Sequence, residues 1–153
     1  MTLWRIVKRH RIEDAFTGEG ARRYGGRWNR VGTRVVYASA SLALAQLEYL
    51  VHANALHAPS NVVCISAEVP DDLPIEEIRS TRLPRHWRRF YPPVDELLDI
   101  GDHWTNTLKS AVLRIPSALV PSESNYLLNP SHPAFTRIAI GKPKAIRFDA
   151  RLF

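Results

Sequence analysis

Hydrophobic and polar residues alternate, or apolar residues cluster, in three segments of the first half of the chain, as is typical of β-strands. These segments are 2–8 (TLWRIVK), 33–39 (TRVVYAS) and 61–70 (NVVCISAEVP). The third contains enough apolar residues to lie in the centre of a sheet. The pattern therefore predicts three strands before residue 71.

Residues 41–53 (SLALAQLEYLVHA) predict a helix, because they are rich in strong helix formers, follow a cap residue at Ser39 or Ser41, and end before HAPSN. Apolar side chains cover almost the whole circumference of this helix, so we expect it to be largely buried. Glu48 then either lies at the rim of the core, paired with an arginine, or lines a cavity.

The rest of the chain mixes short elements of both kinds. No regular alternation of strand and helix is present, so we expect an α+β (mixed α/β) fold and a single domain over residues 1–153. The predicted elements are a turn and short helix in 70–78, a helix over part of 93–101, a second helix over 102–109, two short strands in 111–121 bent at Pro116, and a turn and hairpin after residue 132 that reverses at Gly141 to Pro143.

Composition is that of an ordinary folded domain, with 45% hydrophobic residues among 153. The only cysteine, Cys64, excludes an internal disulfide and is expected to be a buried, unreactive thiol. The N-terminus lacks the features of a signal peptide, and no apolar run approaches the roughly 20 residues of a membrane span. We therefore expect a cytoplasmic protein without a membrane partner.

The formal net charge of +6 comes mainly from arginine, whose planar guanidinium suits phosphate and carboxylate groups. An anionic ligand or partner is therefore expected. The most basic segment besides 22–30 is 81–90 (TRLPRHWRRF), which matches no nucleic-acid recognition motif. We interpret it as solvated surface or a protein contact in preference to a nucleic-acid site.

Segment 22–30 (RRYGGRWNR) places arginines around a Gly25–Gly26 pair that allows a ligand to approach the backbone closely. Arg27 follows directly, and Trp28 indicates that this part of the segment is partly buried. A partly buried arginine needs an anionic partner, which Glu48 or a bound phosphate would supply. The chain has neither a P-loop nor a G-x-G-x-x-G motif.

Two further features leave alternatives open. Tyr37 stands in an apolar strand, where it either fills the core or offers its ring as a stacking platform. The polar segment 120–133 (VPSESNYLLNPSHP) either lines a cleft or only satisfies backbone groups in turns. The six histidines are scattered without metal-ligand spacing, so no metal is predicted.

The motifs GGRWN, VVYAS, SLALAQLEYLVH, GDHW and IPSALVPSESNYLLNPSHP occur in this order, and together they resemble the RES domain family over essentially the full chain. This family is the toxin half of bacterial Xre–RES toxin–antitoxin pairs. The resemblance implies a fold akin to the ADP-ribosyltransferase and diphtheria-toxin group. It also implies that NAD+ is a substrate and that no recycled cofactor is needed.

The resemblance places the family's arginine, tyrosine, glutamate and serine on Arg27, Tyr37, Glu48 and Ser122. The first three are predicted to be catalytic, with Arg27 on the pyrophosphate, Tyr37 on the nicotinamide ring and Glu48 stabilising an oxocarbenium-like ribose. Arg5 is a weaker candidate. The predicted NAD-binding residues are Gly26, Trp28, Asn29, Ser39, Ser122, Asn125 and Asn129.

The predicted function is therefore NAD+ degradation by hydrolysis or phosphorolysis. Protein ADP-ribosylation is the closest alternative, and a non-enzymatic basic module that binds nucleic acid is a third. By the same resemblance, the expected partners are an Xre-type helix-turn-helix antitoxin and a second copy of the chain in a homodimer. The sequence leaves the acceptor of ADP-ribose open among water, phosphate and a protein side chain.

Overall fold

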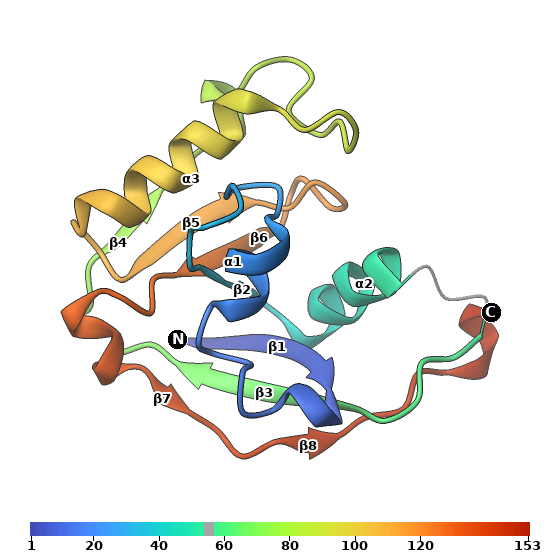
Figure 1. Ribbon diagram of the computed structural model, residues 1–153. Coiled ribbons are helices and arrows are strands. Elements are labelled where there is room, and N and C mark those ends of the chain that lie inside the picture. The colour runs from blue at the N-terminus through green and yellow to red at the C-terminus, as the bar shows by residue number, and fades with distance from the viewer. Residues whose placement is uncertain (54–56) are drawn as a thin grey trace.

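The computed structural model describes residues 1–53 and 57–153, and a strongly curled sheet forms its centre (Figure 1). Within these residues the strand order is β4-β5-β6-β2-β1-β3-β7, and β8 also pairs with β3. The strands are β1 (Thr2–Lys8), β2 (Val36–Ser39), β3 (Val62–Glu68), β4 (Ile75–Glu77), β5 (Val112–Pro116), β6 (Ser124–Leu128), β7 (Ala139–Ile140) and β8 (Lys144–Ala145).

Three α-helices and several 3₁₀ turns surround the sheet in the described residues (Figure 1). The α-helices are α1 (Glu19–Tyr24), α2 (Leu42–Ala53) and α3 (Asp95–Thr107), and the 3₁₀ turns are η1 (Arg9–Arg11), η2 (Ser80–Arg82), η3 (Pro133–Arg137) and η4 (Ala150–Leu152). No helix in the described ranges is long and apolar enough to cross a membrane.

The sheet changes direction between β1 and β2, which share the single residue pair Trp4–Ser39. By contrast, β1 pairs with β3 along its whole length, and β2 pairs with β6 through all four of its residues. Figure 1 accordingly shows β1 and β3 turned away from the β5 and β6 part of the sheet. Residues that follow β2 therefore lie beside the join between two well-paired halves.

Helix α3 covers one face of the β5–β6 part, where Trp28, Leu97, Trp104 and Leu127 form a buried cluster. The close approach requires Gly101, because a Cβ at this position would lie 1.6 Å from the carbonyl oxygen of Trp28. Segment 25–30 is thus clamped between α3 and the sheet.

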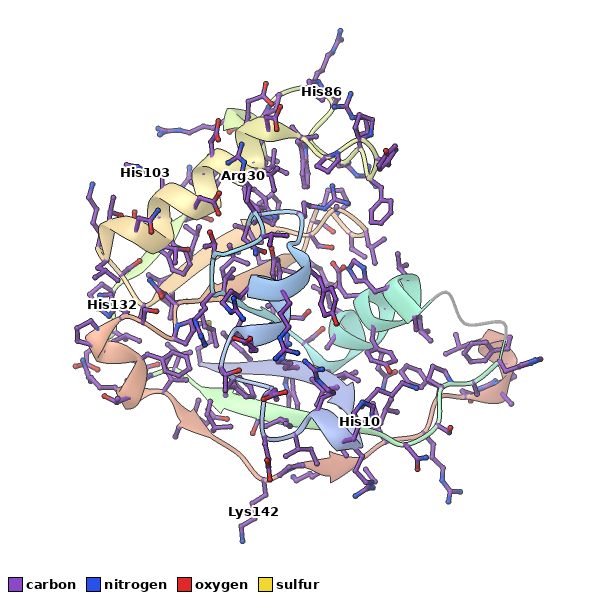
Figure 2. The ribbon with its side chains drawn as sticks, viewed as in Figure 1. His10, Arg30, His86, His103, His132 and Lys142 are labelled. Atoms are coloured by element: carbon purple, nitrogen blue, oxygen red, sulfur yellow. The ribbon has the colours of Figure 1, made fainter. Side chains whose placement is uncertain are left out.

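Arg30 adds an electrostatic contact to this packing. Its guanidinium lies 2.8 Å from Asp99 and 3.1 Å from Asp102 of α3, and Figure 2 shows it next to that helix. Arg30 and Asp99 are exposed and Asp102 is only partly buried, so the ion pairs orient the segment more than they stabilise the fold.

The mixed α/β fold is confirmed, as are strands in 2–8, 33–39 and 61–70 and a helix in 41–53, with bounds shifted by up to three residues. Cys64 is buried in β3, as predicted. The prediction that α2 is largely buried is wrong. Leu47 is 45% exposed and Val51 56% exposed, because the sheet covers only one side of the helix.

Two segments were assigned the wrong kind of structure. Residues 75–77 form strand β4, parallel to β5, and not a short helix. All three residues are exposed at the sheet edge, so they carry no alternating pattern. Within the polar segment 120–133, residues 124–128 form strand β6 in the interior of the sheet, where turn-forming residues on both sides concealed a short strand.

The other errors concern how elements continue or pair. The two helices predicted in 93–109 are one helix, α3, because Gly101 is a packing contact and not a helix end. Only the first of the two strands predicted in 111–121 exists. The predicted C-terminal hairpin is wrong, since β7 and β8 each pair with β3. Helix α1 was not predicted at all.

Candidate functional site

The carboxylate of Glu48 is held at the join of the two halves of the sheet. Its Oε1 accepts a hydrogen bond of 2.8 Å from the hydroxyl of Ser117 and another of 2.5 Å from the side-chain amide of Asn125. Within the described residues, Oε2 makes no hydrogen bond. One oxygen is therefore fixed by the protein, and the other is available to a ligand.

A second layer of hydrogen bonds orients these partners. Ser39, at the end of β2, donates to Oδ1 of Asn125 over 2.8 Å, so the amide nitrogen of Asn125 must point to Glu48. The hydroxyl of Ser117 also accepts from the backbone N–H groups of Leu119 and Val120, at 3.1 Å each. Its proton is thereby directed to the carboxylate.

The serine at this carboxylate is Ser117, which the sequence analysis missed. Ser122, the predicted serine, is exposed and makes no side-chain hydrogen bond in the described part of the chain. Both serines follow a proline in the motif IPSALVPSE, so the motif alone offered two positions. Burial was the missing signal, since Ser117 is 0% exposed.

Tyr37 is fixed by its hydroxyl. The hydroxyl donates to Oδ1 of Asn29 over 2.7 Å and accepts from the backbone N–H of Trp28 over 3.0 Å. Burial raises the pKa of Tyr37 above its ordinary value of 10.0, so the phenol is neutral at physiological pH. A Cβ on Gly26 would lie 2.6 Å from the hydroxyl oxygen, so the backbone reaches the ring only because residue 26 is glycine.

Arg27 is held by carbonyl groups and not by a carboxylate. Its Nη1 donates to the carbonyl oxygens of Trp87 and Arg89 over 3.1 and 3.0 Å. Desolvation lowers the pKa of Arg27, while the negative charge of Glu48 acts in the opposite direction. Glu48 is thus near enough to influence the guanidinium, although the two side chains form no ion pair in the described structure.

Three predicted NAD-binding residues have structural partners instead of open polar atoms. Trp28 is 1% exposed and belongs to the core below α3. Asn29 donates to the carbonyl of Ala21 over 2.9 Å while it holds Tyr37. Asn129 is fully buried and donates to the carbonyl of Thr105. Their positions suit support of the site more than direct contact with a ligand.

The basic segment 81–90 supports Arg27 through its backbone. Besides the two carbonyls already named, Arg88 donates from Nε to the carbonyl of Ala118, which ties the segment to the chain just after Ser117. Phe90 is 71% exposed and Tyr91 82% exposed at the end of this segment.

Histidines are spread over the molecule. Figure 2 shows His10, His86, His103 and His132 in separate places on η1, the loop before α3, α3 itself and the start of η3. In the ranges that the structure describes, no group of three or more His, Cys, Asp or Glu residues is arranged to hold a metal ion. Arginine, carboxylate, amide and hydroxyl groups are the chemistry of this site.

Comparison with known proteins supports one family. A family model described as "RES domain" matches residues 2–149. Toxin Res of Yersinia enterocolitica is 39% identical over 99% of both chains. The Prs ADP-ribosylating toxin of a Sphingobium species is 37% identical over 99% of this chain and 96% of its own.

A solved structure has the same fold. It is the crystal structure of the M. tuberculosis MbcT–MbcA toxin–antitoxin complex, of which one chain superposes with a TM-score of 0.71 at 18% identity. The match covers 99% of this chain and 85% of the other. The curled sheet and its helices therefore recur in a protein of very different sequence.

Proposed function

Because the chain belongs to the RES domain family, we propose that it is a toxin enzyme that cleaves the bond between nicotinamide and ribose in NAD+. Relatives along the full chain are named Toxin Res, and one is named an ADP-ribosylating toxin. ADP-ribosylation takes its ADP-ribose from NAD+, so that name favours NAD+ as the substrate.

The proposal rests on the carboxylate of Glu48, of which one oxygen is hydrogen-bonded within the described residues and the other is not. When the C–N bond of NAD+ breaks, its electron pair goes to the nicotinamide nitrogen, and positive charge develops on the ribose. A carboxylate with one oxygen fixed by Ser117 and Asn125 and the other free is already oriented to stabilise that charge. Nicotinamide leaves as a neutral group, so no strong general acid is required.

Arg27 and Tyr37 would bind the rest of the substrate. The guanidinium of Arg27 keeps its full charge, because its partners are carbonyl groups, and it can pair with the pyrophosphate. Tyr37 has a fixed, neutral ring that can stack on nicotinamide. Ser39, Asn125 and Asn129 already use their side-chain groups in hydrogen bonds within the protein, so we assign them to support of the site and assign contact with the ribose hydroxyls to the second oxygen of Glu48.

The acceptor of ADP-ribose decides among three reactions. Water at the ribose C1″ gives ADP-ribose and a proton, inorganic phosphate gives ADP-ribose 1″-phosphate, and a nucleophilic side chain gives a modified protein. The name of the Sphingobium relative favours the third reaction.

We also propose that the toxin is neutralised by an antitoxin. The structural neighbour comes from a toxin–antitoxin complex, which supports a partner protein of that kind. An Xre-type helix-turn-helix partner and a homodimer of the toxin remain parts of this proposal, as does a cytoplasmic location, where NAD+ and such a partner would both be met.

The test is product analysis of NAD+ incubated with the wild type, Glu48→Gln and the control Glu123→Gln, each made by cell-free synthesis. Glu123 is an exposed glutamate in the segment between Ser117 and Asn125. We expect nicotinamide release by the wild type and by Glu123→Gln, and a loss of about 100-fold or more in Glu48→Gln.

Buffers with and without inorganic phosphate separate ADP-ribose from its 1″-phosphate, and labelled NAD+ reveals any modified protein. Intact NAD+ in every buffer, with folded wild-type protein, would show that the chain does not cleave this substrate. Equal activity of Glu48→Gln and the wild type would remove Glu48 from the mechanism.

A further inference from the structure

A small basic pocket lies between β1, η1 and the start of α1, apart from the side chains assigned above. Its volume is about 170 Å³, which is below the range of pockets that enclose a whole drug-sized ligand. It combines three cationic side chains with one carboxylate. The lining residues are Arg5, Val7, Lys8, Arg11, Asp14, Ala15 and Gly20.

Arg5 is the unusual member of this group. Its Nη1 donates to the carbonyl oxygen of Tyr37 over 2.7 Å, but its Nε is buried and has no hydrogen-bond partner. Arg5 forms no ion pair in the described ranges. Arg5 is partly exposed and lines the pocket, so an anion there would reach a partly desolvated cation that lacks a counter-ion and would stabilise it.

Electrostatics point the same way. Desolvation lowers the pKa of Arg5 to about 10, and the nearby charge of Arg11 also lowers it. Two guanidinium groups therefore repel each other across a partly dry space. The carboxylate of Asp14 is 3.6 Å from Arg11 and is half exposed, so it offsets only part of this charge.

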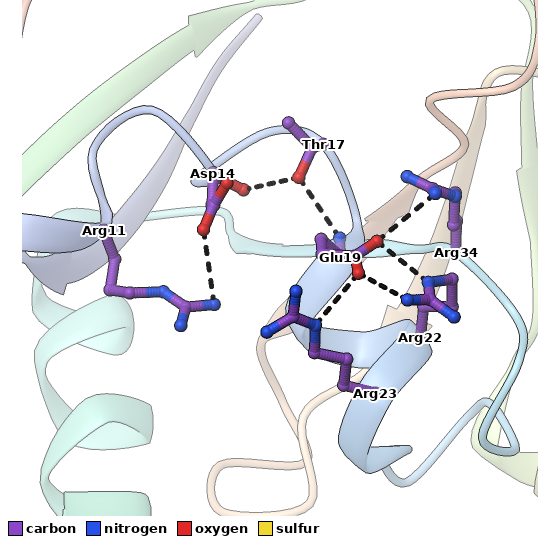
Figure 3. Close-up of polar contacts among 7 residues, drawn as sticks. All are labelled: Arg11, Asp14, Thr17, Glu19, Arg22, Arg23 and Arg34. Carbon is purple, nitrogen blue, oxygen red and sulfur yellow. Dashed lines mark hydrogen bonds and ion pairs between the residues drawn. The ribbon is translucent and has the colours of Figure 1, made fainter.

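The carboxylate of Glu19, next to Gly20 in the chain, has three arginine partners of its own. Figure 3 shows Glu19 surrounded by Arg22, Arg23 and Arg34, whereas Arg11 pairs with Asp14, which Thr17 links only to the backbone of Glu19. The distances from Glu19 to these three arginines are 2.5, 3.0 and 3.3 Å. Glu19 is therefore committed elsewhere and does not neutralise the pocket.

We propose that this pocket binds a phosphate group, with Arg5 and Arg11 as its main ligands and Lys8 at the rim. A water molecule occupies roughly 30 Å³ of the liquid, so the pocket has room for a phosphate and a few waters. Arginine donors suit a tetrahedral oxyanion. The group is supplied either by inorganic phosphate or by the diphosphate of a dinucleotide.

The location gives the site a connection to β2. Arg5 holds the backbone of Tyr37, so an anion that orders Arg5 also orders the strand that carries the tyrosine. The phosphate site itself does not depend on the proposed NAD+ chemistry, but its assignment to a dinucleotide rests on that proposed function.

Gly20 provides a matched pair of variants. A Cβ at this position has only the Nη2 of Arg11 within 4 Å, at 3.9 Å, so a side chain is accommodated. Gly20→Glu would place a carboxylate beside Arg11, and Gly20→Gln would place an uncharged group of the same size there. We expect Gly20→Glu to have the higher Tm without ligand, because it supplies the missing counter-ion.

Thermal unfolding with added inorganic phosphate, against sodium chloride at equal ionic strength, tests the site. Phosphate in hundredfold excess over its Kd should raise the Tm of the wild type and Gly20→Gln by about 5 °C or more, and that of Gly20→Glu far less. No rise in the wild type, or an equal rise in all three proteins, would overturn the proposal.

The second arm identifies the source of the phosphate and uses initial rates of nicotinamide release. A higher KM for NAD+ in Gly20→Glu than in Gly20→Gln assigns the pocket to the dinucleotide, and equal KM values assign it to inorganic phosphate. If NAD+ is not cleaved at all but the phosphate shift is found, the proposed function fails and the pocket stands. If NAD+ is cleaved and all three proteins respond equally to phosphate, the pocket fails and the function stands.

Discussion

Replacement of Ser117 by alanine separates the two serines that the motif offers. The hydroxyl of Ser117 donates to Oε1 of Glu48 over 2.8 Å. Ser122 is exposed, and its side chain makes no hydrogen bond in the described structure. Ser117→Ala should therefore lower the rate of NAD+ cleavage, and Ser122→Ala should leave it within about twofold, as expected for a surface position.

The expected size follows from the bond that is lost. A hydrogen bond to a charged group contributes about 1.5–3 kcal/mol, and each 1.36 kcal/mol corresponds to about a factor of ten in rate. The rate should then fall about 10- to 150-fold. The backbone N–H groups of Leu119 and Val120 also lose their acceptor, so the free energy of unfolding should fall by about 1–3 kcal/mol.

A double-mutant cycle shows whether Ser117 acts through Glu48. Initial rates of nicotinamide release are measured for the wild type, Ser117→Ala, Glu48→Gln and the double variant, at a temperature where denaturant unfolding shows that all four are folded. If the serine only positions the carboxylate, the double variant should be no slower than Glu48→Gln alone. Independent, multiplicative losses would refute the reasoning, as would a larger effect of Ser122→Ala.

Three further substitutions test the surroundings of the site. Gly26→Ala should lower the initial rate of NAD+ cleavage about tenfold or more, because its methyl group would lie 2.6 Å from the hydroxyl of Tyr37 and displace it. An unchanged rate would mean that this contact is unimportant. Gly101→Ala should lower the free energy of unfolding, measured with denaturant, by about 3 kcal/mol or more, because its Cβ would overlap the carbonyl of Trp28. Alanine favours a helix more than glycine does, so a gain in stability would contradict the packing. Hydrogen bonds from two arginines lower the pKa of Glu19 from 4.5 to about 2, so its stabilising effect is present above pH 4.5 and is lost as the pH falls to 2. The difference in free energy of unfolding between the wild type and Glu19→Gln should shrink over that interval. A constant difference would contradict this reasoning.

The elements that the sequence predicts well are those with a strong local signal. Strand β1 was found from its apolar and polar alternation and helix α2 from its run of helix formers and its cap, each within two residues of its bounds. Strand β6 was missed because only residues 126–128 of it are fully buried, and polar turn residues adjoin both ends. Strand β4 was missed because none of its side chains is buried. Its place is set by pairing with β5, which no local pattern encodes.

The candidate site could likewise be predicted only in part. Glu48 could be singled out because a carboxylate on an apolar helix needs a partner. The identity of that partner could not, since Ser117 and Asn125 come from residues 69 and 77 positions away and meet it only through the order of β2, β6 and β5. Of the two anionic partners considered for Arg27, Glu48 forms no ion pair with it in the described residues. The guanidinium bonds instead to two backbone carbonyls, which the sequence does not reveal.

The positive net charge comes mainly from arginines, which differ in their partners. Some surface arginines are matched with carboxylates, as Arg30 is with α3 and Arg137 with Asp72, whereas Arg88 and Arg89 donate only to carbonyl oxygens in the described residues. The two desolvated arginines, Arg5 and Arg27, have only carbonyl partners within the described residues. A carbonyl orients a guanidinium without neutralising it, so both keep a charge that burial makes unfavourable. Excess charge is thus found in segment 81–90 as well as at Arg5 and Arg27, and burial makes it most unfavourable at the latter two, where a phosphate-bearing ligand would relieve it.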